Sequence, residues 1–237
     1  MGLFDFLSKK EKKVEDFYSE KSDGGICITG MPYGSCRTIE IPESTVRIGD
    51  KAFEYRNDIK SVILPKTLKQ IGIYAFDNVK TLEKVDMQDG VITIQRGAFN
   101  DCSALKNVNL PESIITIERE VFYRCVNLEE IELPSKIKII GGYTFLGSGL
   151  KKIAIPEGVT QIGERAFYEC YELEEVLLPS TLIHIENSAF ARCFKLKNIS
   201  LPAQIITVEP SAFFGCEALN ERLKNELTKK FPQSLVL

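Results

Sequence analysis

Seven cysteines are the residues of this 237-residue chain with the most varied possible chemistry, because a thiol can form a disulfide, bind a metal ion or act as a nucleophile. Five of them each follow a phenylalanine by three residues: Cys102, Cys125, Cys170, Cys193 and Cys216. If they stand on successive coils, neighbouring Cα atoms lie about 5 Å apart, which a disulfide tolerates. Stacked side chains point the same way, however, so we expect small, buried, reduced thiols, with ladder disulfides or a metal ion as the alternatives.

The other two cysteines, Cys27 and Cys36, lie outside this register. They could pair near the N-terminal end of the fold, but a free state is expected in a reducing compartment. The chain has no CxxC pair and only one histidine, so we expect neither a metal site nor a cofactor.

Motifs of catalysis are absent from the sequence. It has no Walker-type phosphate loop, no GxGxxG, no GxSxG and no HExxH. The single histidine, His184, takes a repeat position that elsewhere holds Gln70 or Thr93, so we expect a solvated side chain. Paired carboxylates such as Glu129 and Glu130 also follow the repeat, which favours surface decoration over acid–base chemistry. We predict no enzyme, and only a clustered polar pocket or a bound cofactor would revive that alternative.

A repeated unit must position these side chains. Aligned on phenylalanine, the unit is LxxVxLPxxhxxIxxxAFxxC and recurs every 23 residues, with one interval of 22. The phenylalanines are Phe53, Phe76, Phe99, Phe122, Phe145, Phe167, Phe190 and Phe213. A fixed period of this length indicates a solenoid, in which each coil buries its apolar side chains against its neighbours.

Each half of the unit has its own expected structure. The LxxVxL half ends in period-2 alternation, which predicts a short strand with one buried side, and the proline that follows ends it. The second half is too short for a good helix and rich in β-branched residues, so a second short strand or a 3₁₀ turn is expected. Eight coils about 4.8 Å apart would form a rod about 40 Å long.

The pattern divides the chain into four parts. Residues 1–23 are expected to be a flexible or amphipathic tail, 24–41 an N-terminal cap, 42–218 the solenoid and 219–237 a helical C-terminal cap. The last assignment depends on apolar residues that recur every four positions, as on one helical face: Leu219, Leu223, Leu227 and Phe231.

The unit resembles the BspA-type, or Treponema-type, leucine-rich repeat. The stretch VTQIGERAFYECYELEEVLLP, which begins at Val159, is nearly a consensus copy, and the resemblance extends over residues 39–219. It implies a right-handed, β-rich leucine-rich repeat solenoid of about eight coils. As a class, such proteins are frequently bacterial surface or secreted binders of host proteins or other cells.

Charge and N-terminal sequence bear on partners and location. The net charge is −3, so no overall positive field favours nucleic acid. Asp5 splits the apolar N-terminal stretch, and no apolar run is long enough to span a membrane, so a cytoplasmic location is expected. The alternative is a secreted or cell-surface protein whose leader is missing here. The apolar residues and lysines of residues 1–14 could contact a membrane as an amphipathic helix, although a solubilising tail is the competing interpretation.

Opposite charges alternate along the repeat. The second position of LxxVxL holds, coil by coil, Lys60, Glu83, Lys106, Glu129, Lys151, Glu174 and Lys197. Neighbouring strands would therefore pair opposite charges. The alternation also leaves no single-sign stripe for a polyanion.

Apolar side chains accumulate after the phenylalanine in the C-terminal half. We predict that they form an aromatic edge that binds a protein partner, with these anchors: Tyr123, Val126, Tyr168, Tyr171, Phe194 and Phe214. Alternatively, these rings cover loops or pack on the C-terminal helix. The shortened coil at Gly147, Ser148 and Gly149 lacks one residue and its cysteine, which predicts a local bend.

Together these observations predict a non-enzymatic scaffold for protein–protein interaction, intracellular, bacterial and monomeric. The alternative is a secreted or surface adhesin that binds a host or cell-surface protein. An enzyme is the third and weakest possibility.

Overall fold

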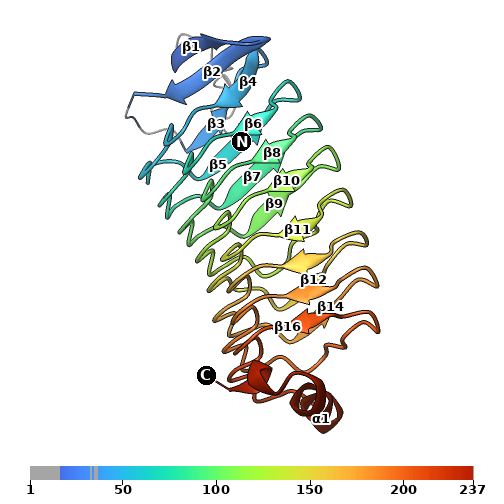
Figure 1. Cartoon of the computed structure of the whole chain (residues 1–237). Coiled ribbons are helices and arrows are strands. Elements are labelled where there is room, and N and C mark those ends of the chain that lie inside the picture. The colour runs from blue at the N-terminus through green and yellow to red at the C-terminus, as the bar shows by residue number, and fades with distance from the viewer. Residues whose placement is uncertain (1–16, 33, 35–36, 237) are drawn as a thin grey trace, which may run out of the picture.

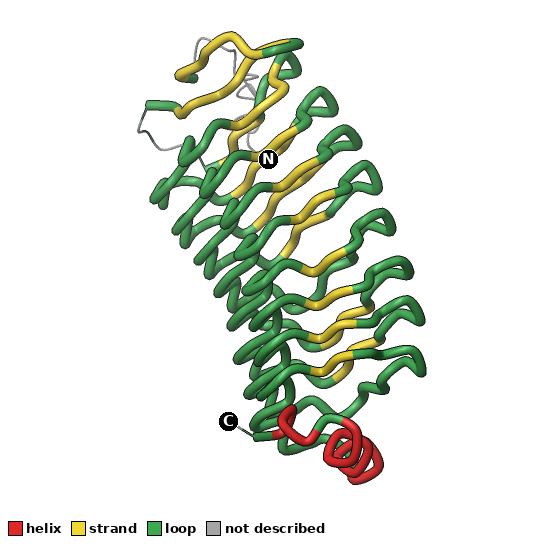
Figure 2. The backbone as a smooth tube through the Cα atoms, in the orientation of Figure 1, coloured by secondary structure: helices red, strands yellow, loops and turns green. Residues whose placement is uncertain are grey.

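The computed structural model describes residues 17–32, 34 and 37–236. These residues form one elongated stack of coils, with a β-hairpin at one end and the helix α1 at the other (Figure 1). Two columns of short strands run along the stack, and turns and loops make up most of each coil (Figure 2). The predicted solenoid with a C-terminal helix is confirmed. The sequence stretch 1–14, considered above for membrane contact, lies outside the described residues.

The LxxVxL segments form the first column, here called the long-strand column. Its first sheet contains β3 (Thr38–Glu40), β5 (Ser61–Leu64), β7 (Lys84–Met87) and β9 (Asn107–Asn109), and its second contains β12 (Lys152–Ala154) and β14 (Glu175–Leu177). Each strand pairs in parallel with the equivalent strand of the next coil, so that Val62 lies beside Val85 and Val85 beside Val108. The alternate side chains of each strand therefore stack into the core.

The second half of the unit forms a second short strand, which was one of the two predicted structures. These strands make up the second column, here called the short-strand column. One sheet contains β1 (Tyr18–Ser22), β2 (Gly25–Gly30), β4 (Thr45–Ile48), β6 (Gln70–Ile71), β8 (Thr93–Ile94) and β10 (Thr116–Ile117). The other contains β11 (Ile139–Ile140), β13 (Gln161–Ile162), β15 (His184–Ile185) and β16 (Thr207–Val208). From β4 to β16 in this column, the last residue of each strand is an isoleucine or valine whose side chain is buried in the core.

A tight turn around each phenylalanine closes the coil. The residues two before and two after it have positive φ in all eight coils, as Arg165 (52°) and Glu169 (58°) do around Phe167. This geometry directs alternate N–H groups to the next coil: Arg165 donates to Asn187 O, Phe167 to Ala189 O and Glu169 to Ala191 O, at 2.8–3.0 Å. Such backbone costs about 1–3 kcal/mol per non-glycine residue, which the hydrogen bonds between coils offset.

The phenylalanine rings form a continuous stack inside the solenoid. All eight are buried, and neighbouring ring centroids lie 4.9–5.8 Å apart with nearly parallel planes. The widest spacings are 5.8 Å between Phe99 and Phe122 and 5.6 Å between Phe122 and Phe145.

The five cysteines of the repeat are free and buried, as expected. Each thiol donates to the carbonyl oxygen of the phenylalanine in the preceding coil at 3.0–3.3 Å, as Cys193 does to Phe167. Cys27 is also free and buried, whereas Cys36 lies outside the described residues, so their pairing stays open.

Both ends of the stack are covered. β1 and β2 form an antiparallel hairpin, and β2 pairs with β4, so the ordered N-terminal cap begins before the expected boundary at residue 24. At the other end, Asn220 caps α1 (Glu221–Lys230), which buries Leu223 and Leu227. The 3₁₀ helix η2 (Pro232–Leu235) then takes the place of a further coil, because Phe213 N–H donates to Ser234 O at 2.8 Å.

Both strand columns are interrupted at the same coil. Residues 128–149, here called the interrupted coil, contain no long strand, and their short strand β11 pairs with β13 but not with β10. The break can be followed in Figure 1 between β9 and β12. This is the coil that the sequence shows to be one residue short. The turn side stays continuous, since Phe122 N–H donates to Thr144 O at 2.9 Å.

Candidate protein-binding surface

The turn after each phenylalanine presents side chains at the edge of the stack. There Tyr171 and Phe194, from neighbouring coils, stack with centroids 5.5 Å apart and planes 6° from parallel. Tyr171 is 42% exposed and Phe194 39% exposed. The ladder that buries the phenylalanines of the core is thus repeated at the surface by two rings that face water. Such a rigid, exposed aromatic pair is typical of a binding anchor.

Arginines, which were not among the six predicted anchors, surround these rings. The Arg192 guanidinium lies 6.0 Å from the Phe194 ring and forms an ion pair with Glu169 at 2.9 Å. Arg165 lies 5.7 Å from the Tyr168 ring. Both arginines occupy positive-φ positions of the turn. In the sequence, these arginines stand two residues before or after a phenylalanine of the repeat. That spacing alone does not place them over rings, because the turn geometry determines where their side chains lie.

The six predicted anchors do not form one surface. Val126, Tyr171 and Phe194 are exposed, whereas the following are half-buried: Tyr123, Tyr168 and Phe214. The interrupted coil separates Tyr123 and Val126 from the others, because it presents the buried Leu146 and the small Gly149 at the equivalent positions. We therefore restrict the aromatic edge to the C-terminal group: Tyr168, Tyr171, Phe194 and Phe214.

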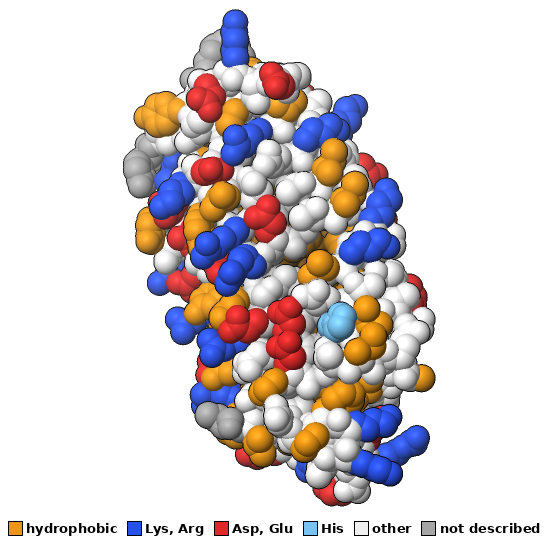
Figure 3. Space-filling model, in the orientation of Figure 1, with side chains coloured by type: hydrophobic (Ala, Val, Ile, Leu, Met, Phe, Trp, Pro, Cys, Tyr) orange, Lys and Arg blue, Asp and Glu red, His pale blue; other side chains and the backbone are white. Residues whose placement is uncertain are grey.

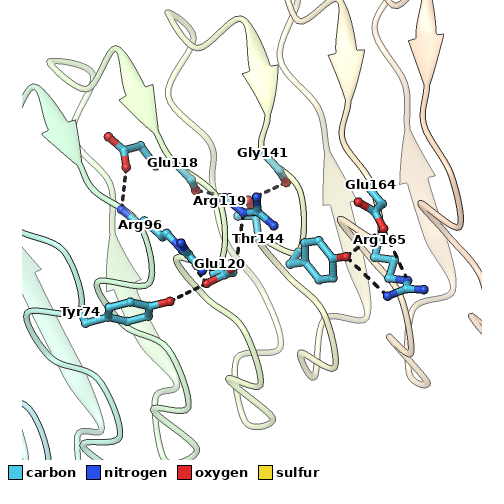
Figure 4. A network of polar contacts seen from close by, with 10 residues as sticks. Tyr74, Arg96, Glu118, Arg119, Glu120, Gly141, Thr144, Glu164 and Arg165 are labelled. Carbon is cyan, nitrogen blue, oxygen red and sulfur yellow. Dashed lines mark hydrogen bonds and ion pairs between the residues drawn. The ribbon is translucent and has the colours of Figure 1, made fainter.

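A polar network ties the turns of several coils together (Figure 4). Glu120 accepts hydrogen bonds from Tyr74 OH at 2.8 Å and from Arg96 Nε at 2.9 Å. Burial alone would raise the pKa of Glu120, but these two hydrogen bonds hold that pKa below its ordinary value. The Arg119 guanidinium lies 5.2 Å from the Tyr143 ring, so the network continues across to the interrupted coil.

Charges on the long-strand column pair between coils, as the alternation predicted, with one exception. Lys60 and Glu83 are 2.7 Å apart, and both Glu129–Lys151 and Glu174–Lys197 are 2.6 Å apart. Among the described residues Lys106 forms no ion pair, because Glu83 on one side pairs with Lys60 and Glu129 on the other pairs with Lys151. Basic and acidic side chains are interspersed over the face seen in Figure 3, which offers a polyanion no continuous stripe.

A groove lies where the long-strand column is interrupted. Its volume is about 890 Å³, and β7, β9 and residues 127–132 line it. This groove was not predicted from the sequence. The pattern that could have indicated it is the low strand propensity of two successive repeats, which have asparagines at 107 and 109 and glutamates at 129, 130 and 132.

The single histidine of the chain is half-buried and has a threonine as its side-chain partner. His184 Nδ1 lies 2.8 Å from Thr207 Oγ1 on the short-strand column. No group of three or more His, Cys, Asp or Glu side chains among the described residues is placed to hold a metal ion. Within the same part of the chain, no helix has the length and apolar character needed to cross a membrane.

Comparison with known proteins agrees with this architecture. The BspA type leucine rich repeat region, in six copies, matches residues 32–151 and 138–234. The chain therefore belongs to the BspA-type leucine-rich repeat family, whose members are generally non-catalytic. No curated protein matches the chain in sequence.

Solved structures extend the comparison. A leucine-rich repeat protein of T. pallidum is 26% identical, with a TM-score of 0.68 over 93% of this chain and 95% of that chain. A leucine rich cell surface protein of Faecalibacterium prausnitzii is 22% identical, with a TM-score of 0.59 over 90% and 82% of the two chains. The pneumococcal vaccine antigen PcpA is 24% identical, with a TM-score of 0.51 over 78% and 61%. The last two likenesses concern the fold alone.

Proposed function

We propose that this protein is a non-enzymatic scaffold that binds a protein partner through the aromatic edge. The observation that carries the proposal is the stacked pair Tyr171 and Phe194, which stays exposed although the same chain buries all eight ladder phenylalanines. A ring pair already stacked loses little conformational freedom on binding. The nearby guanidinium of Arg192 adds a donor and a charge to the apolar rings, a combination frequent at interface hot spots.

Two locations are compatible with this role. We propose the interior of the cell, with a monomer that presents its edge to an intracellular protein. The alternative is a surface adhesin, which the solved likeness described as a cell surface protein favours. Protease treatment of intact cells separates the two, since only a surface protein is cleaved before lysis.

Affinity capture from the native cell lysate tests the binding site. The intact chain is compared with a Tyr171→Ser, Phe194→Ser double variant, and the matched control is Ile92→Ser, Ile206→Ser, which removes two exposed apolar side chains from the short-strand side. We expect one protein to be retained by the intact chain and by the control but not by the double variant. Melting temperatures of all three proteins should agree within a few degrees.

Equal capture by all three proteins would exclude the aromatic edge as the binding site. If none of them retains a protein from the lysate but the intact chain binds the surface of host or neighbouring cells, the adhesin alternative replaces the intracellular one.

A further inference from the structure

The turn of the interrupted coil presents almost no side chain to water. In the two neighbouring coils five residues stand between the ladder phenylalanine and the next core leucine, whereas this coil has four, residues 146–149. Leu146 and Ser148 are buried, and the other two are Gly147 and Gly149. Residues 146–149 are here called the bare turn, because main chain makes up most of their surface.

The bare turn results from missing side chains and not from a gap between coils. The Phe145 ring centroid lies 5.6 Å from that of Phe122 and 5.3 Å from that of Phe167, which is ordinary spacing for this stack. Gly147 N–H donates to Tyr168 O at 2.8 Å, so the main chains also stay joined here. The exposed side chains of the two neighbouring coils therefore stand two coil steps apart, with no exposed side chain between them.

One face of the Tyr171 ring is directed at the bare turn. The other face stacks on Phe194 with planes 6° from parallel, so the normal to the ring runs along the stack. Gly149 has the equivalent repeat position in the preceding coil and no side chain that could cover the first face. Val126 is exposed on the far side of the bare turn. A planar group placed on the bare turn would therefore extend the surface stack by one ring, between Tyr171 and Val126.

Arg124 gives the bare turn a positive charge at one border. A Cβ at Gly147 would lie 3.5 Å from Arg124 Cγ, so the arginine side chain runs beside the bare turn. Its guanidinium lies 5.4 Å from the Tyr123 ring and forms no ion pair within the described part of the chain. Glu169 at the other border is already paired with Arg192 at 2.9 Å. The charge left without a partner is positive and favours an acidic ligand.

We propose that the bare turn binds an aromatic side chain from an acidic segment of a partner protein. The ring of the partner stacks on the open face of Tyr171 and takes the place of the ring that this coil lacks. A carboxylate beside that ring in the segment pairs with Arg124. The inference rests on the function proposed above, because Tyr171 belongs to the aromatic edge, and it adds the chemistry that the edge recognises.

The test uses the full chain and a defined peptide. The chain has no tryptophan, so the indole fluorescence of a probe reports binding without background. The probe is an end-capped peptide with one tryptophan between two glutamates, and serine and glycine elsewhere. We expect a saturable blue shift of its emission with a Kd below about 1 mM.

Two control peptides test the stated chemistry. A peptide with lysines in place of the glutamates should bind at least about threefold more weakly, and added salt should reduce this difference. A peptide with leucine in place of tryptophan should displace the probe at least about threefold less well than the unlabelled tryptophan peptide made with the same flanking residues, because leucine has no ring to stack.

One added side chain tests the bare turn itself. Gly147 has a φ of 64°, and asparagine adopts a similar φ of 58° at the equivalent position 78, so Gly147→Asn keeps the fold and covers the bare turn. Gly24→Asn is the matched control, because Gly24 also has positive φ and lies between β1 and β2 at the far end of the stack (Figure 1). We expect Gly147→Asn to weaken probe binding at least about threefold and Gly24→Asn to leave it unchanged.

Arg124→Gln is a second variant, at an exposed side chain, and it should abolish the preference for glutamate over lysine in the peptide. No binding at about 1 mM probe, equal binding to the Gly147→Asn protein, or equal binding of either control peptide overturns the proposal. A cellular protein that is lost by the Tyr171→Ser, Phe194→Ser variant but retained by Gly147→Asn would support the proposed function and exclude the bare turn as its site.

Discussion

Asn109 forms both of its side-chain hydrogen bonds with the backbone of Met87 in the preceding coil. Its Nδ2 donates to Met87 O at 2.7 Å, and its Oδ1 accepts from Met87 N–H at 3.0 Å. A side-chain amide thus takes the place of the main chain in the last step of the ladder between β7 and β9. The regular strand register ends here, immediately before the interrupted coil.

Replacing Asn109 with alanine should therefore lower the free energy of unfolding more than replacing Asn107 does. Asn109→Ala leaves the N–H and C=O of the buried residue Met87 without partners, which we expect to lower the free energy of unfolding by about 1–2 kcal/mol. Asn107→Ala is the control, because the Asn107 side chain is exposed and forms no hydrogen bond within the described structure. Urea unfolding followed by circular dichroism measures both, and equal values would contradict a bridging role for Asn109.

The core and surface aromatic ladders should differ in stability. Phe167→Ala removes a buried ring between two stacked neighbours, and we expect a loss of about 3–5 kcal/mol in unfolding free energy. Phe194→Ala should cost less than about 1 kcal/mol, because the ring is exposed. Thermal melts of the two variants distinguish these outcomes. A large loss for Phe194→Ala would show that this ring supports the fold, and would weaken it as a binding anchor.

The buried thiols should make the protein sensitive to alkaline pH. Burial raises the pKa of Cys102 and Cys125 well above the ordinary value, so both stay protonated in the folded state. Their stabilising effect is complete below the unfolded pKa of about 8.5 and is lost as pH rises above it, because only the unfolded chain releases these protons. Each group contributes a slope of about 1.4 kcal/mol per pH unit. Urea titrations between pH 8 and 10 measure how the free energy of unfolding depends on pH. Cys125→Ala should reduce that dependence by the slope of one thiol.

Native thiols should also resist modification. At pH 8 we expect negligible reaction of the five repeat cysteines with iodoacetamide over the time in which the urea-unfolded chain reacts completely. Mass spectrometry of peptides containing Cys170, Cys193 and Cys216 provides the measurement. Rapid labelling of any of them in the folded protein would show that the coil opens locally.

A buried arginine should make the N-terminal cap sensitive to acid. Arg56 donates to both carboxylate oxygens of Asp58 at 2.8 and 2.7 Å and to Met31 O at 2.8 Å. These interactions hold the pKa of Asp58 below its ordinary value, so their stabilisation is present above about pH 4 and disappears as pH falls through the folded pKa. We expect Arg56→Ala to cost about 2–3 kcal/mol at pH 7 and less at pH 3. Arg222→Ala on the exposed side of α1 is the control, and an Arg56→Ala cost that does not change with pH would contradict the coupling to Asp58.

Part of the candidate surface could be predicted from residue types and part could not. The apolar character of Tyr171 and Phe194 at equivalent repeat positions indicated exposed rings at one edge, and the structure stacks them. Tyr123 and Val126 have the same character but lie beyond the interrupted coil, because that coil has glycine and a buried leucine where a ring would continue the surface. Arg165 and Arg192 were missed because a left-handed turn, not their spacing in the sequence, places them beside rings.

The 23-residue period by itself determined the coil, the buried columns and the reduced cysteines, because each apolar position meets its own counterpart in the next coil and no other arrangement buries them all. The capping helix was determined by a separate local pattern, in which leucines recur every four residues. The missing residue showed which coil is irregular, but only the tertiary structure decided that both strand ladders are interrupted there. That outcome depends on main-chain hydrogen bonds between residues about 23 positions apart. Whether these bonds form is a property of two coils together, and the sequence of one coil does not determine it. The long-strand ladder therefore stops at β9, although the repeat pattern continues beyond it.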